Sequence, residues 1–143
     1  MSAATITPYL MFGGRCQEAL DFYRDALGAE LEFKMLYSES PHPAPPGMLQ
    51  EGWENKIMHA SFRIRGALLM ASDGRDDKSV GDGIHLALSL PTAADVQRAC
   101  DALAQGGTVE MPPTETFWSP CFGMVTDRFK IGWMISVPGE QPA

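Results

Sequence analysis

The sequence repeats one order of secondary structure in its two halves, and this repeat restricts the fold more than any single motif. Each half has an apolar strand, an amphipathic helix and three further strand-like segments, a β-α-β-β-β order. The apolar positions of the first helix recur in the second helix at one constant offset along the chain. The matched positions are Ala19, Phe22, Tyr23, Ala26 and Leu27 with Val96, Ala99, Cys100, Leu103 and Ala104. Duplication of such a unit predicts two related modules.

Alternation, helical spacing and turn residues predict where each element begins and ends. The expected strands are 5–12, 31–37, 57–64, 67–72, 84–90, 108–111, 122–126 and 131–137. The expected helices are 15–27 and a second one that Thr92 caps and Gly106-Gly107 ends. The fold class is therefore α+β: two βαβββ modules forming a curled, mostly antiparallel sheet with one main helix per module. We expect one domain over 1–143, with modules 4–73 and 83–138 joined by a polar connector at 74–82.

Between the second and third strands, residues 38–55 contain four prolines and two glycines. Proline at that density prevents regular helix or ladder hydrogen bonding. We therefore expect a long mobile loop, of the kind that often closes over a functional site. Trp53 in this loop could contact an apolar ligand or a second subunit, although packing is the more common role of such a residue.

Composition excludes several classes of partner. The formal charge of −7 argues against nucleic acid and against an anionic membrane surface, which both require basic residues. No apolar run reaches the length of about 20 residues that a membrane helix needs. The first residues do not resemble a signal peptide. The three cysteines, Cys16, Cys100 and Cys121, are widely spaced and suit reduced thiols in the cytoplasm.

The order and spacing of short motifs resemble those of the vicinal-oxygen-chelate superfamily, which includes glyoxalases, bleomycin-resistance proteins and dioxygenases. Within it, the PhnB-like branch is the most similar. The motifs are residues 6–10 (ITPYL), 19–23 (ALDFY), 56–60 (KIMHA), 69–73 (LMASD) and 127–129 (DRF), followed by Trp133. The chain departs from that branch at Lys130, where glycine is usual in the final turn. The resemblance implies a homodimer and a small-molecule cleft between curled sheets.

The two-residue period of a strand predicts which side chains face that cleft. Three leucines alternate with His85 and Ser89, and they are expected to face the helix, so both polar residues point to the concave side. By the same reasoning His59, Ser61 and Arg63 share the concave face of the third strand. We therefore predict that these five residues bind the small molecule.

The resemblance also implies a divalent metal held by the first and last strands of each module. His85 matches the histidine ligand of the second module, whereas the first-module position corresponds to Pro8. The two carboxylate positions fall near Met70 and Met134. One of four ligands is thus present, and His59 is the other histidine that could contribute. A structural or catalytic zinc site normally has three or four protein ligands.

Three functions remain open from the sequence. The first is a glyoxalase- or bleomycin-resistance-like protein with a small-molecule cleft and an unspecified reaction. The second is a metal-free protein that binds or sequesters a drug or metabolite, for which the acidic charge suits a cationic ligand. The third is a metal-dependent lyase, isomerase or dioxygenase that uses His85, with His59 as a further ligand. The residues do not identify a catalytic group in any of these.

Overall fold

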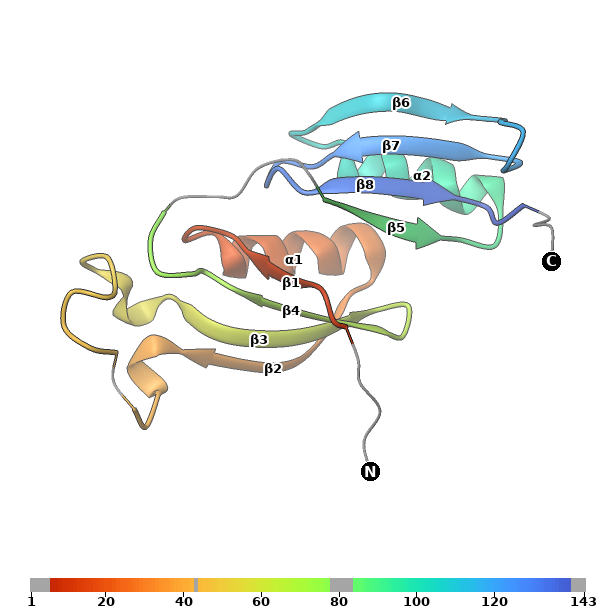
Figure 1. The fold of residues 1–143 in the computed structure, drawn as a ribbon. Helices are drawn as coiled ribbons and strands as arrows, with labels where there is room; N and C mark the ends of the chain where they lie inside the picture. Colours follow the sequence, from red (N-terminus) through yellow and green to blue (C-terminus); the bar gives the residue numbers. More distant parts are fainter. Residues whose placement is uncertain (1–5, 43, 78–83, 140–143) are drawn as a thin grey trace. The chain divides into compact units, whose positions relative to one another are not determined.

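In a computed structural model the chain divides into two compact units, Met1–Val80 and Gly81–Ala143. The structure describes residues 6–42, 44–77 and 84–139. Each unit holds a four-stranded sheet and one main helix, which confirms the expected α+β class (Figure 1). The start of the first expected module and most of the connector, residues 78–82, lie outside the described residues.

The first unit has the strand order β1-β4-β3-β2. Its elements are β1 (Tyr9–Met11), α1 (Cys16–Leu27), β2 (Glu30–Leu36), β3 (Ile57–Ile64) and β4 (Ala67–Ser72). Strands β1 and β4 are parallel, and the other two pairs are antiparallel. A parallel pair requires a crossover, and α1 and the two strands after it provide this connection.

The core of this unit lies between α1 and one face of the sheet. The helix buries Cys16, Ala19, Leu20 and Tyr23, whose i, i+3, i+4, i+7 spacing places them on one face. The Tyr23 ring stacks on Phe62 of β3, with centroids 6.4 Å apart and planes 8° from parallel. Gly28 ends the helix in a left-handed conformation, with φ of 71°.

The second unit repeats this arrangement with the order β5-β8-β7-β6. Its elements are β5 (His85–Ser89), α2 (Ala93–Leu103), β6 (Thr108–Thr114), β7 (Phe122–Thr126) and β8 (Gly132–Ser136). Strands β5 and β8 are parallel, as β1 and β4 are in the first unit. The Thr92 hydroxyl accepts a hydrogen bond from the Asp95 backbone N–H, which confirms Thr92 as the cap of α2.

Several boundaries differ from the expected ones: the opening strand of the first unit is shorter, Tyr9–Met11, and three other differences have a physical reason. Helix α2 ends at Leu103, before the Gly106-Gly107 pair, because the chain there already turns toward β6. Strand β6 continues through two prolines to Thr114, which is compatible with its position at the sheet edge, where missing N–H groups cost little. The loop 38–55 contains two short 3-10 helices, η1 (Tyr37–Glu39) and η2 (Trp53–Asn55), rather than irregular chain alone.

Candidate functional site

The face of each sheet opposite its helix is called here the open face. In β3 the helix side holds Ala60, Phe62 and Ile64, which are at most 3% exposed. The residues between them, His59, Ser61 and Arg63, are half-buried and lie on the open face. The alternation expected from the sequence therefore places the three polar side chains together on one surface.

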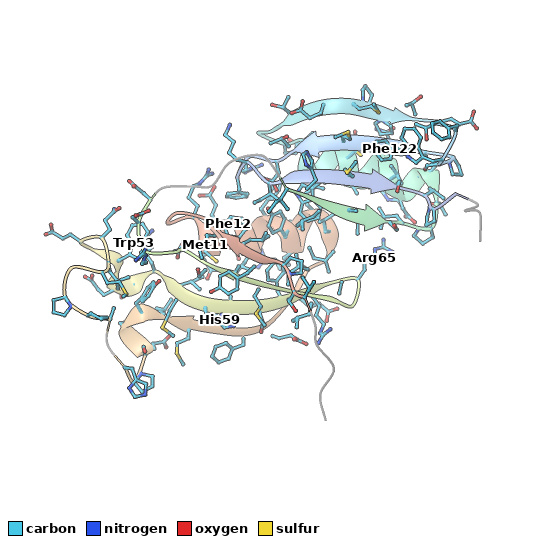
Figure 2. The ribbon with its side chains drawn as sticks, in the orientation of Figure 1. Met11, Phe12, Trp53, His59, Arg65 and Phe122 are labelled. Carbon is cyan, nitrogen blue, oxygen red and sulfur yellow. The ribbon has the colours of Figure 1, made fainter. Side chains whose placement is uncertain are left out.

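His59 lies between two aromatic side chains on the open face of the first sheet. Its ring centroid is 5.8 Å from that of Tyr9 in β1 and 6.1 Å from that of Phe33 in β2. The Tyr9 hydroxyl is 3.4 Å from His59 Nδ1, so a long hydrogen bond is available whose direction depends on the tautomer. We call Tyr9, Phe33 and His59 the aromatic group; Figure 2 labels His59 on β3.

The aromatic group is accessible rather than part of the core. Tyr9 is 42% exposed and Phe33 is 47% exposed, and the neighbouring Met11 is 52% exposed. Met35 pairs with His59 across the strands and adds a further apolar side chain. Local sequence pattern does not identify Tyr9 or Phe33 as site residues, because their proximity to His59 depends on the strand order β1-β4-β3-β2.

Arg63 is already paired at the edge of this surface. Its Nε donates to Glu32 Oε2 at 2.8 Å, and a terminal nitrogen donates to the Gly66 carbonyl at 2.9 Å. A guanidinium engaged in this way is less available to an anionic ligand, since that ligand must compete with Glu32. Ser61 lies between Phe33 and Met70 in the same cross-strand row.

In the second unit, His85 and Ser89 lie on the open face of β5, where both are exposed. The His85 imidazole rests on Gly132 of the neighbouring strand β8. A Cβ at Gly132 would lie 2.7 Å from His85 Nε2 and closer still to Cδ2, an approach that no real Cβ atom tolerates. Glycine at this position therefore allows the imidazole to lie flat against the sheet.

A row of three methionines crosses the same open face. Met111 of β6 pairs with Met124 of β7, and Met124 pairs with Met134 of β8. All three side chains are half-buried. Val125, which follows Met124, and Ile135, which follows Met134, point instead to the core. Local sequence pattern does not reveal this row, because the three residues lie on three different strands and only the strand register brings them together.

Backbone hydrogen bonds show how the two opening strands correspond. Phe12 N donates to the Ser72 carbonyl, and Leu90 N donates to the Ser136 carbonyl. Each bond directly follows the last ladder pair of the two parallel strands, Met11 with Ser72 or Ser89 with Ser136, so Phe12 and Leu90 are counterparts. The separation in sequence between Phe12 and Leu90 is one position longer than the separation between matched helix residues. The reason is that the loop from Leu90 to α2 is one residue shorter than the loop from Phe12 to α1.

This shift by one position corrects the counterpart of His85. The offset of the opening strands pairs His85 with Thr7, not with Pro8. Met70 and Met134 are counterparts, since each lies two residues before the serine in those bonds. No histidine or carboxylate therefore occupies the corresponding position of the first unit.

The donor groups within each unit do not fit a hard divalent metal ion. Such an ion takes three or more histidine or carboxylate ligands. Among residues 6–42, 44–77 and 84–139, no group of three His, Cys, Asp or Glu side chains converges. His59 has aromatic and thioether neighbours, and Glu32 is paired with Arg63. The chemistry of either open face is that of apolar and soft groups around one histidine.

The loop 38–55 forms a separate pocket of about 380 Å³ that is open to solvent and is lined in part by Tyr37, Pro46, Leu49 and Trp53. Trp53 is only 5% exposed, and its Nε1 donates to the Gly74 carbonyl at 2.8 Å. Its ring also packs on Gly14, where a Cβ would lie 3.0 Å from the indole. Trp53 therefore anchors the loop to the body of the unit, which is the packing role.

The three cysteines are buried and unpaired. Burial raises the pKa of the Cys16 thiol strongly and that of Cys100 to about 11. Thiols with raised pKa values are poor nucleophiles at neutral pH. Packing is therefore the role that their surroundings support.

Within the described residues, no helix is both long and apolar enough to cross a membrane. This agrees with the sequence, in which no apolar run of that length occurs.

Comparisons with known proteins agree with the resemblance drawn from the motifs. A family model described as the Glyoxalase/Bleomycin resistance protein/Dioxygenase superfamily matches residues 5–135. Protein YjdN of Escherichia coli is 39% identical over 145 residues, covering 96% of this chain and 97% of YjdN. The crystal structure of PA1353 from Pseudomonas aeruginosa is 38% identical, with a TM-score of 0.81 over 96% of this chain and 100% of PA1353.

Two further structures share the fold. A PhnB protein from Bacillus cereus, described as a putative 3-demethylubiquinone-9 3-methyltransferase, is 25% identical with a TM-score of 0.76, covering 94% of this chain and 99% of its own. FosX from Listeria monocytogenes, a fosfomycin resistance protein, is 12% identical with a TM-score of 0.62, covering 95% of this chain and 93% of its own. The structure of a FosX mutant contains Mn(II). At this low identity the similarity to FosX concerns the fold alone.

Proposed function

The chain belongs to the Glyoxalase/Bleomycin resistance protein/Dioxygenase superfamily, and we propose that it binds a small organic molecule on the open faces of its sheets. The observation that carries this proposal is the aromatic group, Tyr9, Phe33 and His59. These three rings come from three different strands and are accessible on one surface. Ligand sites are mostly apolar surfaces with a few polar groups that orient the ligand.

Each residue of the first open face has a role in this proposal. Phe33 and Tyr9 offer ring faces for stacking against a planar ligand. His59 and Ser61 are the polar groups that orient the ligand by hydrogen bonds. Arg63 contributes through its stem and its pair with Glu32, because that pair neutralises its charge.

In the second unit, His85 and Ser89 are the corresponding polar candidates on the open face of β5. We include both in the binding surface because they are exposed and stand beside the methionine row. The net charge of −7 favours a cationic or neutral ligand over an anionic one. A drug or metabolite with an aromatic, positively charged group fits these conditions best.

A thermal-shift screen tests the proposal, because ligands that bind the native state raise its melting temperature. Cationic, neutral and anionic aromatic compounds are compared on the wild type and on Phe33→Ala and His59→Ala. We expect cationic aromatics to raise Tm in the wild type and much less in both variants. Phe117→Ala is the matched control, because Phe117 is 97% exposed and lies outside the aromatic group. Equal shifts in all four proteins, or no shift by any compound, would refute the proposal.

The alternative is a metal-dependent lyase, isomerase or dioxygenase that uses His85 and His59. The position of His85 within the family pattern favours it, and the Mn(II) in the FosX structure is an example of a metal ion bound by a protein of the same fold. The donor groups of each unit count against it, as described above. Elemental analysis of protein prepared without a chelator or affinity tag decides the matter. One stoichiometric divalent metal ion that His85→Ala removes would favour the enzyme over a metal-free binding protein.

We also propose that the protein is a cytoplasmic homodimer. Large apolar side chains outside the aromatic group are exposed at Leu31, Val109 and Trp118, and such residues are common at subunit interfaces. Three unpaired thiols suit a reducing compartment. Light scattering of the purified protein measures the mass directly, and a value of one chain would contradict the dimer. A dimer that binds no compound in the thermal-shift screen would instead have a structural role.

A further inference from the structure

The pocket formed by the loop 38–55 has no part in the proposed function, which concerns the open faces of the sheets. We propose that this pocket, called here the loop pocket, binds a small aliphatic amine in its protonated, positively charged form. Its volume of about 380 Å³ lies within the range of roughly 300–1,000 Å³ that is common for small-molecule sites. The residues differ from those of the aromatic group, so either proposal can fail without the other.

The walls of the loop pocket are largely apolar. The Tyr37 ring, Leu49 and the pair Pro45-Pro46 contribute side chains from separate points along the chain. Trp53 also lines the pocket, but it is only 5% exposed, so it offers a ligand little surface. Walls of this kind suit the hydrocarbon part of a ligand, because removing apolar surface from water favours binding.

Hydrogen bonds to the chain that follows β4 hold the loop pocket in shape. The Tyr37 hydroxyl and Trp53 Nε1 both donate to the Gly74 carbonyl, at 2.9 and 2.8 Å. The Gln50 N–H donates to the Arg75 carbonyl at 2.9 Å. Three lining residues are thus fixed before a ligand arrives, which lowers the entropy that binding costs.

Glu54 supplies the charge in this lining. Its side chain is exposed, and it forms no hydrogen bond or ion pair within the part of the chain that the structure describes. A carboxylate in this state attracts a cation, and an ammonium group can donate charge-assisted hydrogen bonds to it. The Ser38 hydroxyl, in the same lining, can accept another hydrogen bond from the ammonium group.

Lys56 is the basic residue closest in sequence to Glu54, and its ammonium group is engaged elsewhere. Its Nζ donates to the Gly14 carbonyl at 2.8 Å and lies 5.7 Å from the centroid of the Trp53 ring. Lys56 does not line the loop pocket. The carboxylate of Glu54 therefore remains available to a positively charged ligand, which the net charge of −7 also favours.

The walls distinguish this ligand from the one proposed for the aromatic group. There, two accessible rings offer faces for stacking, whereas here proline and leucine side chains prevail and the Trp53 ring is almost covered. A saturated hydrocarbon packs on such walls without needing a ring face. Aliphatic amines resemble the lysine side chain, with a pKa of about 10.4, and are therefore positively charged at neutral pH.

Three cyclohexane derivatives of similar size test the proposal: cyclohexylamine is positive at neutral pH, cyclohexanol is neutral and cyclohexanecarboxylate is negative. Binding is followed in the full-length protein labelled with 5-fluorotryptophan, in which Trp53→Phe identifies the ¹⁹F signal of Trp53. We expect the amine to shift this signal in a saturable manner. The alcohol should bind roughly fivefold more weakly, since it lacks the charge interaction with Glu54, and the carboxylate should not bind.

Glu54→Gln removes the charge and keeps the size of the side chain. Glu51→Gln is the matched control, because Glu51 is exposed in the same loop but does not line the pocket. Circular dichroism and thermal melts verify that both variants fold. We expect Glu54→Gln to bind the amine roughly fivefold more weakly than the wild type, and no better than it binds the alcohol, while Glu51→Gln binds the amine as the wild type does.

Equal affinity for the amine in the two glutamine variants would overturn the proposal, as would the absence of a saturable shift of the Trp53 signal. Loss of amine binding in Phe33→Ala would place the amine at the aromatic group and would overturn the proposal as well. Failure of the aromatic compounds in the thermal-shift screen would leave it intact, because those compounds test the open face.

Discussion

Lys130 has a left-handed backbone, with φ of 72°, in the turn between β7 and β8. Its N–H donates to the Asp127 carbonyl at 3.0 Å, so the turn is closed around it. A side chain in this conformation costs about 1–2 kcal/mol, whereas glycine adopts it freely but loses more entropy on folding. We expect Lys130→Gly to raise the free energy of unfolding by about 0.5–1 kcal/mol, measured by urea denaturation. Lys130→Ala is the control and should give no gain.

The contact between His85 and Gly132 can be measured as a coupling energy. Gly132→Ala places a methyl group within 2.7 Å of the imidazole Nε2, so the ring must move. Because His85 is exposed and its ring can rotate into a less favourable position, we expect a modest loss of stability of about 0.5–1.5 kcal/mol in the wild-type background. His85→Ala removes the obstacle, so the same glycine substitution should cost much less in that background. A double-mutant cycle by urea denaturation gives the difference, and equal costs in both backgrounds would contradict the contact.

At the scale of elements, one buried carboxylate joins a helix to a strand. Asp73 is 2% exposed and follows β4. Its two oxygens accept from the Cys16 N–H at the start of α1 and from the Ile57 N–H at the start of β3, each at 2.7 Å. The sequence placed Asp73 at the end of the first module, directly before the polar connector 74–82, and did not predict that its carboxylate is buried.

Replacing this carboxylate by an amide should destabilise both element ends together. In Asp73→Asn one acceptor oxygen becomes an NH₂ group that faces a backbone donor, which leaves a buried N–H unsatisfied. The expected loss is about 1–3 kcal/mol in the free energy of unfolding. Asp25→Asn, an exposed change on α1, should stay within about 0.5 kcal/mol. Losses of the same size in both variants would show that the Asp73 bonds do not stabilise the fold.

Periodicity within an element was sufficient to predict which face each residue occupies. Leucines alternate with His85, and Phe62 and Ile64 alternate with Arg63, so both open faces could be inferred from local pattern. Local pattern did not predict which strands are neighbours or which residues pair between them. The aromatic group and the methionine row depend on strand order and register, which local sequence does not encode. The constant offset of the repeat was correct for the helices but not for the opening strands, because the loops before the two helices differ in length by one position.

At the scale of the whole molecule, each unit buries at least one thiol that is neutral at physiological pH. Cys16 lies in α1, and Cys100 and Cys121 lie in the second unit. Burial is the main cause of the raised pKa values of Cys16 and Cys100, with the nearby Asp73 as a second cause for Cys16. The folded state therefore binds these protons more tightly than the unfolded state does. The stabilisation that the protonated thiols contribute is complete below their unfolded pKa of 9.0. It is lost as the pH rises toward their pKa in the folded state.

We therefore predict that the free energy of unfolding falls between pH 9 and 11, the ordinary and raised pKa values of Cys100, by an amount on the order of 1 kcal/mol. Urea denaturation at several pH values measures the slope. Cys100→Ala removes one titrating thiol and keeps every other charge, so its stability should fall less steeply over that range. Comparing slopes rather than absolute values cancels the cost of the small cavity that the substitution creates. Parallel curves for the two proteins would mean that other groups cause the alkaline loss, since growing negative charge acts on both proteins equally.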